Sequence, residues 1–280
     1  GTQGVYYAMG TALAEVWRER LGLGEAPVVV PTAGSVANLD LLGSGGADVA
    51  FSQVDTAADR LATVRTGDPR APRALARIYD DVVQVVVRAS APITTLDDLR
   101  GARVSVGARD SGVFVVAGRL LAAAGVDVDR DLRAVRLGIN ESVDALYAGE
   151  IDAFFWSGGL PTAGVRDLAR ALPIRLLDLE DVLVIVRDRH PVYASRTVPA
   201  TSYDIGAPVT TVAVRNVLLV TAAMPADLAG ALVDALFAAR PQLAQVNPLA
   251  LTIVSRAAIG TQPVPLHPGA EGFYRASKQV

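Results

Sequence analysis

The sequence has 280 residues, 51% of them hydrophobic and 20% charged, and 26 basic against 29 acidic residues give a formal net charge of −3. This balance excludes the strongly basic stripe that nucleic-acid binding requires, so we expect no nucleic-acid partner. The absence of cysteine excludes thiol catalysis, zinc fingers, iron–sulfur ligation and a disulfide framework. Two histidines, both followed by proline, and no metal-ligand spacing lead us to expect no metal, no cofactor and no catalytic residue.

The mean hydropathy of +0.35 raises the question of a membrane span. A spanning helix needs about 18 consecutive apolar residues. The longest candidates, residues 82–87 and 212–224, are short or broken by Gln84, Arg215, Asn216 and Thr221, so we predict no span. The chain begins without Met or a signal-peptide pattern, and we therefore expect a trimmed chain whose targeting segment lies outside it.

Apolar, β-branched runs alternate along the chain with helical stretches. The predicted strands are residues 26–30, 48–51, 82–87, 103–106, 132–137, 151–155, 174–179 and 210–214. The predicted helices are residues 8–20, 35–42, 56–65, 112–124, 141–147, 162–171 and 226–239. Continuous apolar strands separated by amphipathic helices predict an α/β fold with mostly parallel sheets covered on both faces.

Four residue types recur at one offset of 104 positions. The two sets are Leu42, Gly45, Asp48, Phe51 and Leu146, Gly149, Asp152, Phe155. Each set predicts a helix end, a glycine turn, a short apolar strand and a small polar loop. We interpret the pattern as a duplication, which implies two lobes that each place a loop at the carboxyl end of a strand, where ligands of open α/β sheets bind.

Two crossings between these lobes are predicted. The extended stretch at residues 85–88, followed by Ala91 and Pro92, leads to the second lobe, and the return lies near residues 208–214. Lobe I is then discontinuous, with residues 1–87 and 206–280, and lobe II comprises residues 88–205. The predicted ligand cleft lies between them.

The candidate residues of lobe I lie at a helix start and around one strand. Tyr6 and Tyr7 begin an apolar helix, where they either wall a pocket or simply pack. Ser35 is either a helix cap alone or part of an anion site together with Asn38, because a helix start presents free N–H groups. The loop that follows the strand at 48–51 adds Gln53 and Asp55.

The candidate residues of lobe II follow two further strands. Residues 106–113 form a glycine-flanked turn before a helix, so Ser111, Gly112, Val113 and their N–H groups can hold a carboxylate. Arg109 adds a charged clamp there or pairs with Asp110 in solvent. The second loop contains an aromatic ring followed by small residues: Trp156, Ser157, Gly158 and Gly159.

Taken together, these segments resemble the TAXI-type solute receptors of TRAP transporters, a group of periplasmic binding proteins (type II). The likeness follows nearly the whole chain in order, through residues 4–7, 32–38, 47–55, 104–107, 111–112, 151–155, 159–162, 209–214 and 264–270. It implies two α/β lobes that close on a small carboxylate-bearing solute, and it places His267 in a structural motif. The family's Gly-Ser-Gly-Thr-like loop is Asp-Ser-Gly-Val here, and its first strand is missing from the chain.

From the residues and the resemblance we predict a non-catalytic, extracytoplasmic solute-binding protein. Its partners are an anionic or zwitterionic solute (an amino acid, dicarboxylate or 2-oxo acid) and the membrane subunits of a TRAP transporter, and we expect a monomer. The alternatives are the ligand-sensing module of a receptor and, disfavoured by the scarcity of histidine and cysteine, an enzyme on the same scaffold.

Overall fold

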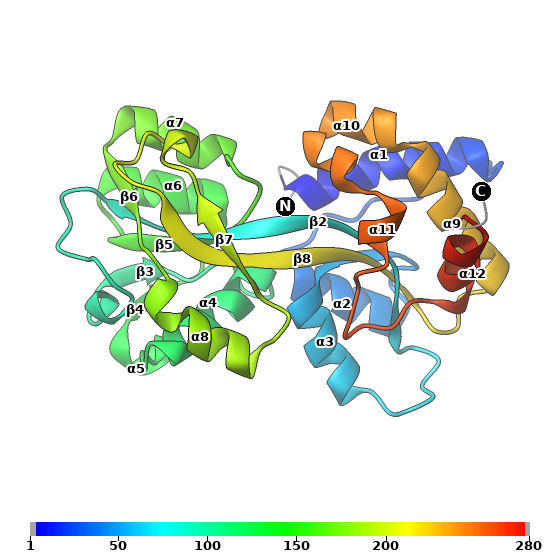
Figure 1. Cartoon of the computed structure of the whole chain (residues 1–280), viewed down its shortest axis with the longest axis horizontal. Helices are drawn as coiled ribbons and strands as arrows, with labels where there is room; N and C mark the ends of the chain where they lie inside the picture. Colours follow the sequence, from blue (N-terminus) through cyan, green and yellow to red (C-terminus); the bar gives the residue numbers. More distant parts are fainter. Residues whose placement is uncertain (1–3, 278–280) are drawn as a thin grey trace. The chain divides into compact units, whose positions relative to one another are not determined.

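Two compact units make up the chain in the computed structural model, which describes residues 4–277. Unit 1 comprises Gly1–Tyr79 and Arg215–Val280, and unit 2 comprises Asp80–Val214. Both boundaries fall inside long strands, β2 (Pro72–Arg88) and β8 (Val209–Thr221), so the chain leaves unit 1 along one strand and returns along the other (Figure 1). None of the helices within residues 4–277 is long and apolar enough to cross a membrane.

Unit 1 surrounds the outer parts of β2 and β8 with helices. Its elements are α1 (Val5–Arg20), α2 (Ser35–Ser44), β1 (Ala50–Gln53), α3 (Val54–Thr63), α9 (Ala226–Ala238), α10 (Arg240–Val246), the 3-10 helix η3 (Pro248–Thr252), α11 (Ser255–Ala258) and α12 (Pro268–Ala276). Its core joins apolar side chains of α1, α9 and α12 to both long strands, and includes Met9, Leu13, Leu218, Leu236 and Tyr274.

Unit 2 has helices on both faces of its strands (Figure 1). Its elements are η1 (Asp97–Leu99), β3 (Arg103–Ser105), α4 (Gly112–Ala123), α5 (Val128–Asp131), β4 (Arg133–Val135), α6 (Ile139–Ala148), β5 (Ala153–Gly158), α7 (Ala163–Ala171), β6 (Ile174–Leu176), α8 (Glu180–Arg189), β7 (Ala194–Val198) and η2 (Ala200–Ser202).

Period-two alternation divides the apolar residues of unit 2 between two cores. Val83 and Val85 of β2 face the core beneath α4 and α8, whereas Val82 and Val86 face the core beneath α6 and α7. The neighbouring residues Phe155 and Phe154 of β5 divide in the same way. Both faces of these strands are therefore covered, which explains the continuous apolar runs in the sequence.

The sheet is mixed, which corrects the prediction of mostly parallel pairing. Parallel ladders join β3 to β4 and to β5. The ladders of β1 with β8, of β2 with β5 and β6, and of β7 with β8 are antiparallel. The chain leaves unit 1 on β2 and returns on β8, and both long strands have antiparallel neighbours. A continuous apolar run in the sequence indicates a strand buried on both faces, but it does not show whether the neighbouring strands are parallel or antiparallel.

The predicted strand at residues 26–30 is also wrong, because the structure has non-regular backbone there. Val28 is 89% and Val30 51% exposed. An apolar β-branched run forms a strand only when a sheet edge is available to pair with it.

The repeat at offset 104 is confirmed in backbone geometry. Helix α2 ends at Gly45 and α6 ends at Gly149, both in the left-handed region with φ of 80° and 77°. The N–H of Gly45 donates to the carbonyl of Leu42 at 3.3 Å, and that of Gly149 donates to Leu146 at 3.2 Å. Each glycine therefore ends its helix with the same αL cap and directs the chain into β1 or β5.

The same correspondence extends to the starts of these helices. Gly34 precedes α2 and Gly138 precedes α6, again 104 positions apart, and each carbonyl accepts the N–H of the residue four positions later at 2.9 Å. Each unit thus contains one copy of a helix–glycine–strand module.

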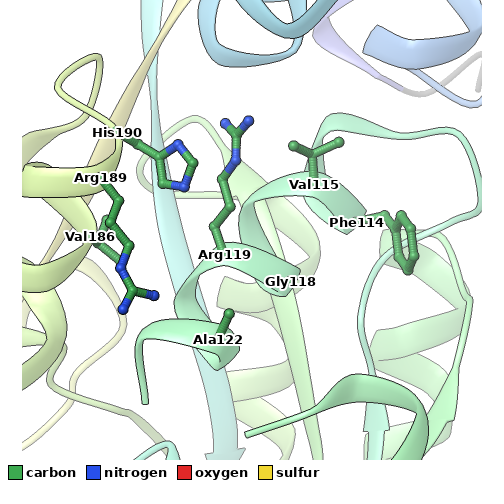
Figure 2. Close-up of a pocket in the computed structure, with 8 residues that line it drawn as sticks. All are labelled: Phe114, Val115, Gly118, Arg119, Ala122, Val186, Arg189 and His190. Carbon is green, nitrogen blue, oxygen red and sulfur yellow. The ribbon is translucent and has the colours of Figure 1, made fainter. Parts of the chain in front are cut away.

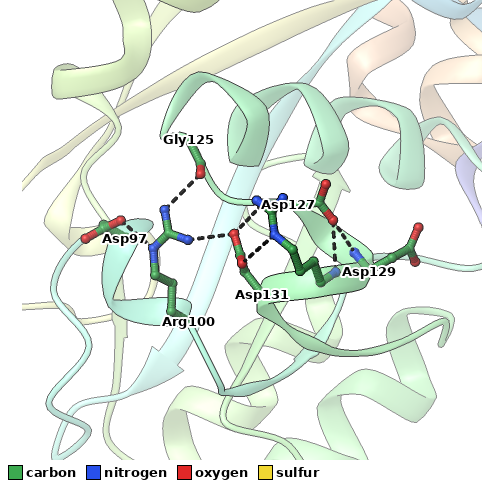
Figure 3. Close-up of polar contacts among 7 residues, drawn as sticks. Asp97, Arg100, Gly125, Asp127, Asp129 and Asp131 are labelled. Atoms are coloured by element: carbon green, nitrogen blue, oxygen red, sulfur yellow. Dashed lines mark hydrogen bonds and ion pairs between the residues drawn. The ribbon is translucent and has the colours of Figure 1, made fainter.

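A polar network joins η1, the end of α4 and α5 (Figure 3). Arg100 donates to Asp97 at 2.9 Å, to Asp131 at 2.6 Å and to the carbonyl of Gly125 at 2.8 Å. The N–H of Asp127 donates to Asp131 at 2.9 Å. This N–H, together with the Arg130 guanidinium, lowers the pKa of Asp131 from 3.8 to about 2.

Because the folded state depresses this pKa, the stabilisation is present above about pH 4 and is lost as the pH falls toward 2. We expect Asp131→Asn to lower the melting temperature at pH 7 and to flatten its decrease between pH 4 and 2. Thermal unfolding across this pH range measures both effects. The matched variant Asp129→Asn should keep the wild-type profile, and identical profiles for Asp131→Asn and wild type would contradict the assignment.

Candidate functional site

In unit 1, five polar residues meet where β1 passes into α3, and we call them the β1 cluster: Tyr6, Ser35, Gln53, Asp55 and Asn216. Ser35 lies at the start of α2, and its Oγ accepts the N–H of Gln53 at 3.0 Å. Gln53 pairs in register with Asn216 of β8. All four residues other than Tyr6 are at least 97% buried. The cluster therefore brings together residues from five elements: α1, α2, β1, α3 and β8.

Ser35 is not the helix cap that the sequence allowed as an alternative. Gly34 occupies the N-cap position, with φ of 142°, and the Ser35 hydroxyl instead fastens α2 to the end of β1. A glycine tolerates this φ because it has no Cβ.

Tyr6 is held in the cluster by a ring contact with Phe51 of β1 and by a hydrogen bond from its hydroxyl to Asn216. The ring stacks on Phe51 with centroids 5.3 Å apart, and the hydroxyl donates to Oδ1 of Asn216. Tyr7 is the next residue of α1, and a helix turns by about 100° per residue, so the two tyrosines point in different directions. The structure thus places Tyr6 in the cluster and leaves Tyr7 out of it.

Asn216 was missed as a candidate, because in the sequence it only interrupts an apolar run. It is 0% exposed, and its Nδ2 has no hydrogen-bond partner within residues 4–277. Leaving a buried donor unsatisfied costs about 1–3 kcal/mol. An amide in the middle of an otherwise apolar strand is the sequence signal that could have identified it.

The amide of Asn38 is engaged on both sides within unit 1. Its Nδ2 donates to the carbonyl of Phe51 at 2.8 Å, and its Oδ1 accepts the Thr32 hydroxyl at 2.5 Å. Asp55 begins α3 and accepts the N–H of Thr56 at 2.7 Å. Asn38 therefore joins the turn before α2 to β1, and Asp55 satisfies a donor at a helix start.

In unit 2, the loop before α4 has the turn that the sequence predicts. Ser111 is the N-cap: its Oγ accepts the N–H of Phe114 at 3.2 Å and donates to the carbonyl of Ala108 at 2.6 Å. Gly107 has φ of 90°, and a Cβ there would lie 2.7 Å from Val113, so only glycine allows this close turn. Gly112 and Val113 follow as the first two helical residues and are buried.

Arg109 and Asp110 lie exposed at the tip of this loop. Asp110 adopts a positive φ of 63°. Within residues 4–277 Arg109 makes no ion pair or hydrogen bond, so the predicted alternative of an Arg109–Asp110 pair is wrong.

The end of β5 and the loop that follows it are held by what we call the Trp156 network: Gln84, Trp156, Thr162 and Tyr203. The indole N–H of Trp156 donates to Oγ1 of Thr162 at 2.9 Å. That hydroxyl donates to the carbonyl of Gly159 at 2.6 Å. The Tyr203 hydroxyl accepts the N–H of Thr162 at 2.8 Å and donates to Oε1 of Gln84 at 2.6 Å. Burial raises the pKa of Tyr203, so the phenol stays a donor at neutral pH.

Gly158 allows the indole to fold back over its own strand, because a Cβ there would lie 2.6 Å from Nε1 of Trp156. The neighbouring Ser157 is 5% exposed, and its hydroxyl donates to Asp81 at 3.4 Å. Trp156, Ser157 and Gly158 therefore belong to the end of strand β5, paired with β2, and only Gly159 lies in the loop that follows, which corrects the predicted loop. Sequence reasoning missed the Gln84, Thr162 and Tyr203 side chains that order it, because they lie far apart in the chain.

We expect Tyr203→Phe to lower the free energy of unfolding by about 1–3 kcal/mol, because it leaves the Thr162 N–H and the Gln84 amide without their buried partner. Urea unfolding followed by Trp156 fluorescence measures the loss, since the indole is bonded to the same threonine. Tyr147→Phe, at a 59% exposed tyrosine, is the matched control and should be neutral. Equal stability of Tyr203→Phe and wild type would contradict the role of the hydroxyl.

The part of the chain that the structure describes holds no group of three or more His, Asp or Glu residues that could bind a metal. The polar groups of both units are hydroxyls, amides, backbone N–H groups and carboxylates, which suit reversible binding of a small polar solute. Unit 1 offers the β1 cluster, and unit 2 offers the Ser111 helix start and the end of β5 at Trp156.

Comparison with known proteins gives both a family and a fold. The model of the NMT1-like family matches residues 1–276. The periplasmic binding protein BugD superposes with a TM-score of 0.58 at 13% identity, covering 100% of this chain and 90% of its own. XAC2383 from Xanthomonas citri, bound to ATP, gives a TM-score of 0.57 at 16% identity over 96% and 91%.

The periplasmic aliphatic sulphonate binding protein SsuA from Escherichia coli gives a TM-score of 0.50 at 16% identity, covering 96% of this chain and 79% of its own. These likenesses confirm the predicted fold class, an α/β periplasmic-binding-protein-like fold.

Proposed function

Because the chain belongs to the NMT1-like family and has this fold, we propose that it is an extracytoplasmic solute-binding protein. It captures a small solute and hands it to a membrane transporter, without catalysing a reaction. The supporting observation is the buried Asn216 amide of the β1 cluster, whose Nδ2 has no protein acceptor within residues 4–277. A ligand oxygen would satisfy this donor.

We further propose that the solute is a small organic anion or zwitterion with a carboxylate. The helix start at Ser111 presents N–H groups and the positive end of the α4 dipole, both of which favour negative charge. Two proteins with the same fold are described with anions, aliphatic sulphonate and ATP. Arg109 is exposed at the loop tip and can reach toward an arriving anion without first breaking an ion pair.

The other residues predicted from the sequence are also part of the proposed solute site. Tyr6, Ser35, Asn38, Gln53 and Asp55 contribute from lobe I, and Ser111, Gly112, Val113, Trp156, Ser157, Gly158 and Gly159 contribute from lobe II. Tyr7 stays a predicted aromatic wall. The division predicted from sequence, near 87/88 and 205/206, differs from the unit boundaries at 79/80 and 214/215. Closure on the solute is proposed to follow from its higher affinity for the closed state.

For the membrane partner we propose the subunits of a TRAP-type transporter. The protein would deliver the solute to them as a monomer. This proposal rests on the sequence resemblance. It requires the ligand-loaded protein, and not the empty protein, to support uptake in vesicles that contain those subunits.

A solute screen tests the binding function. We expect at least one carboxylate among amino acids, dicarboxylates and 2-oxo acids to raise the melting temperature, because a ligand at about 100 times its Kd adds about 2.7 kcal/mol of stability. Trp156 fluorescence should change in the same titration and should not respond in Trp156→Phe, which retains Trp17 as an internal reference. If no solute, carboxylate or otherwise, raises the melting temperature, the binding proposal is wrong.

A further inference from the structure

A second pocket lies in unit 2, between α4 and the end of α8, and we call it the α4–α8 pocket (Figure 2). It has a volume of about 300 Å³, at the lower end of the range for small-molecule sites. Its lining residues are Phe114, Val115, Gly118, Arg119, Ala122, Val186, Arg189 and His190. None of them belongs to the predicted solute site.

The α4 side of this pocket is open because it contains Gly118. A glycine inside a helix costs about 0.5–1 kcal/mol relative to alanine. Close packing does not require it here, because a Cβ at Gly118 would meet nothing within 4 Å. Together with Ala122, one turn later, it leaves a shallow apolar floor on the outer face of α4.

The side chains of the pocket that can carry a charge are all basic. Arg119 rises from α4, and Arg189 and His190 come from the end of α8 (Figure 2). The lining contains no Asp or Glu. Such a set of residues favours an anion, and the apolar floor favours a ligand with a hydrocarbon body.

Tyr193 contacts two of these basic side chains, Arg119 and His190, and fixes their positions. Its hydroxyl accepts Nη1 of Arg119 at 3.0 Å, and the Arg119 guanidinium lies 5.8 Å from its ring centroid. The His190 ring meets the same ring edge-on at 5.9 Å. Tyr193 itself is 2% exposed. Fixed donors lose less conformational entropy when an anion binds.

We propose that the α4–α8 pocket is a second binding site, for a small organic monoanion with a short apolar body. The carboxylate lies against the Arg189 guanidinium, which extends toward Ala122, whereas that of Arg119 extends the other way (Figure 2). The hydrocarbon chain lies over Gly118 and Ala122. The site is separate from the β1 cluster and the Ser111 helix start, and its existence does not depend on the proposed solute-binding function.

Hexanoate is a suitable probe, and 1-hexanol is its uncharged counterpart. In amide NMR of the isotope-labelled protein, hexanoate should produce saturable shifts at residues 114–122 and 186–190. Hexanol should produce smaller shifts that do not saturate. Equal effects of the two compounds, no shifts with hexanoate, or shifts confined to residues 106–113 and 156–159 would each overturn the proposal.

Two substitutions remove different features of the pocket. Arg189→Glu reverses a charge at the rim, and Gly118→Leu fills the floor; each should weaken hexanoate binding by about tenfold or more. The matched control is Arg187→Glu, which makes the same charge change in the same last turn of α8 but outside the pocket. It should retain wild-type affinity within about twofold, and an equal loss in Arg187→Glu and Arg189→Glu would overturn the proposal.

Discussion

Asn216→Leu is expected to weaken binding of the proposed carboxylate solute by about ten- to hundredfold. Leucine has a similar volume but no amide, so the variant lacks the buried Nδ2 donor that we expect to bond to the solute. A hydrogen bond to a charged group contributes about 1.5–3 kcal/mol, which corresponds to this range of affinities. Isothermal titration of the solute found in the thermal screen measures the change.

The matched control for this variant is Asn140→Leu, the same substitution at an exposed position of α6. It should leave the affinity unchanged. Since Asn216→Leu also removes the acceptor of the Tyr6 hydroxyl, Tyr6→Phe separates the two effects: it removes that hydroxyl but retains Nδ2, and should weaken binding less. Wild-type affinity in Asn216→Leu would exclude Asn216 from the site while leaving solute binding itself intact.

Gly269→Ala is expected to lower the free energy of unfolding by about 3 kcal/mol, the largest stability effect that we predict. Helix α12 crosses α9 at this glycine, and a Cβ would lie 2.0 Å from the carbonyl oxygen of Ala226 and 3.0 Å from Cβ of Ala229. Overpacking of this kind forces backbone shifts because the obstacle is itself backbone. Urea unfolding followed by Trp17 fluorescence reports it, since Trp17 is buried against α9 in the same unit.

Gly272→Ala is the control for this experiment, with the same substitution one turn later on α12. A Cβ at Gly272 meets nothing within 4 Å, so alanine should be neutral or stabilise by up to about 1 kcal/mol. Similar losses in both variants would show that general helix effects, and not the crossing with α9, determine the result.

Most helices could be predicted from sequence because their apolar faces and glycine ends are local signals. The prediction of residues 35–42 found α2, and the repeat at Gly45 and Gly149 located two strand starts. Helix α8 and strand β7 were not predicted. Val184 on α8 is 77% exposed, and four of the five residues of β7 are exposed, so neither segment has the alternation by which a buried face is recognised.

The candidate site could be predicted only where its residues follow one another in the chain. The turn at Ser111 and the segment Trp156–Gly159 are each continuous in the chain; the structure keeps the first as a turn and places Trp156, Ser157 and Gly158 of the second in strand β5. Asn216 and Tyr203 reach their places through strand register and long-range hydrogen bonds, which a single sequence does not reveal. The sequence does not show which of Tyr6 and Tyr7 belongs to the site, because the buried face of a helix depends on the elements that pack against it.

Because the unit boundaries lie inside β2 and β8, recombination within these two strands can exchange unit 2 as a whole. The two strands are neighbours in the sheet, and near the outer end of the pair the N–H of Ala222 donates to the carbonyl of Ala71 at 2.9 Å. All of unit 2 is therefore an insertion that enters and leaves through adjacent strands. Two recombination points, one in β2 and one in β8, are therefore enough to exchange unit 2 between related proteins. The polar groups that each unit contributes can then evolve separately from those of the other unit.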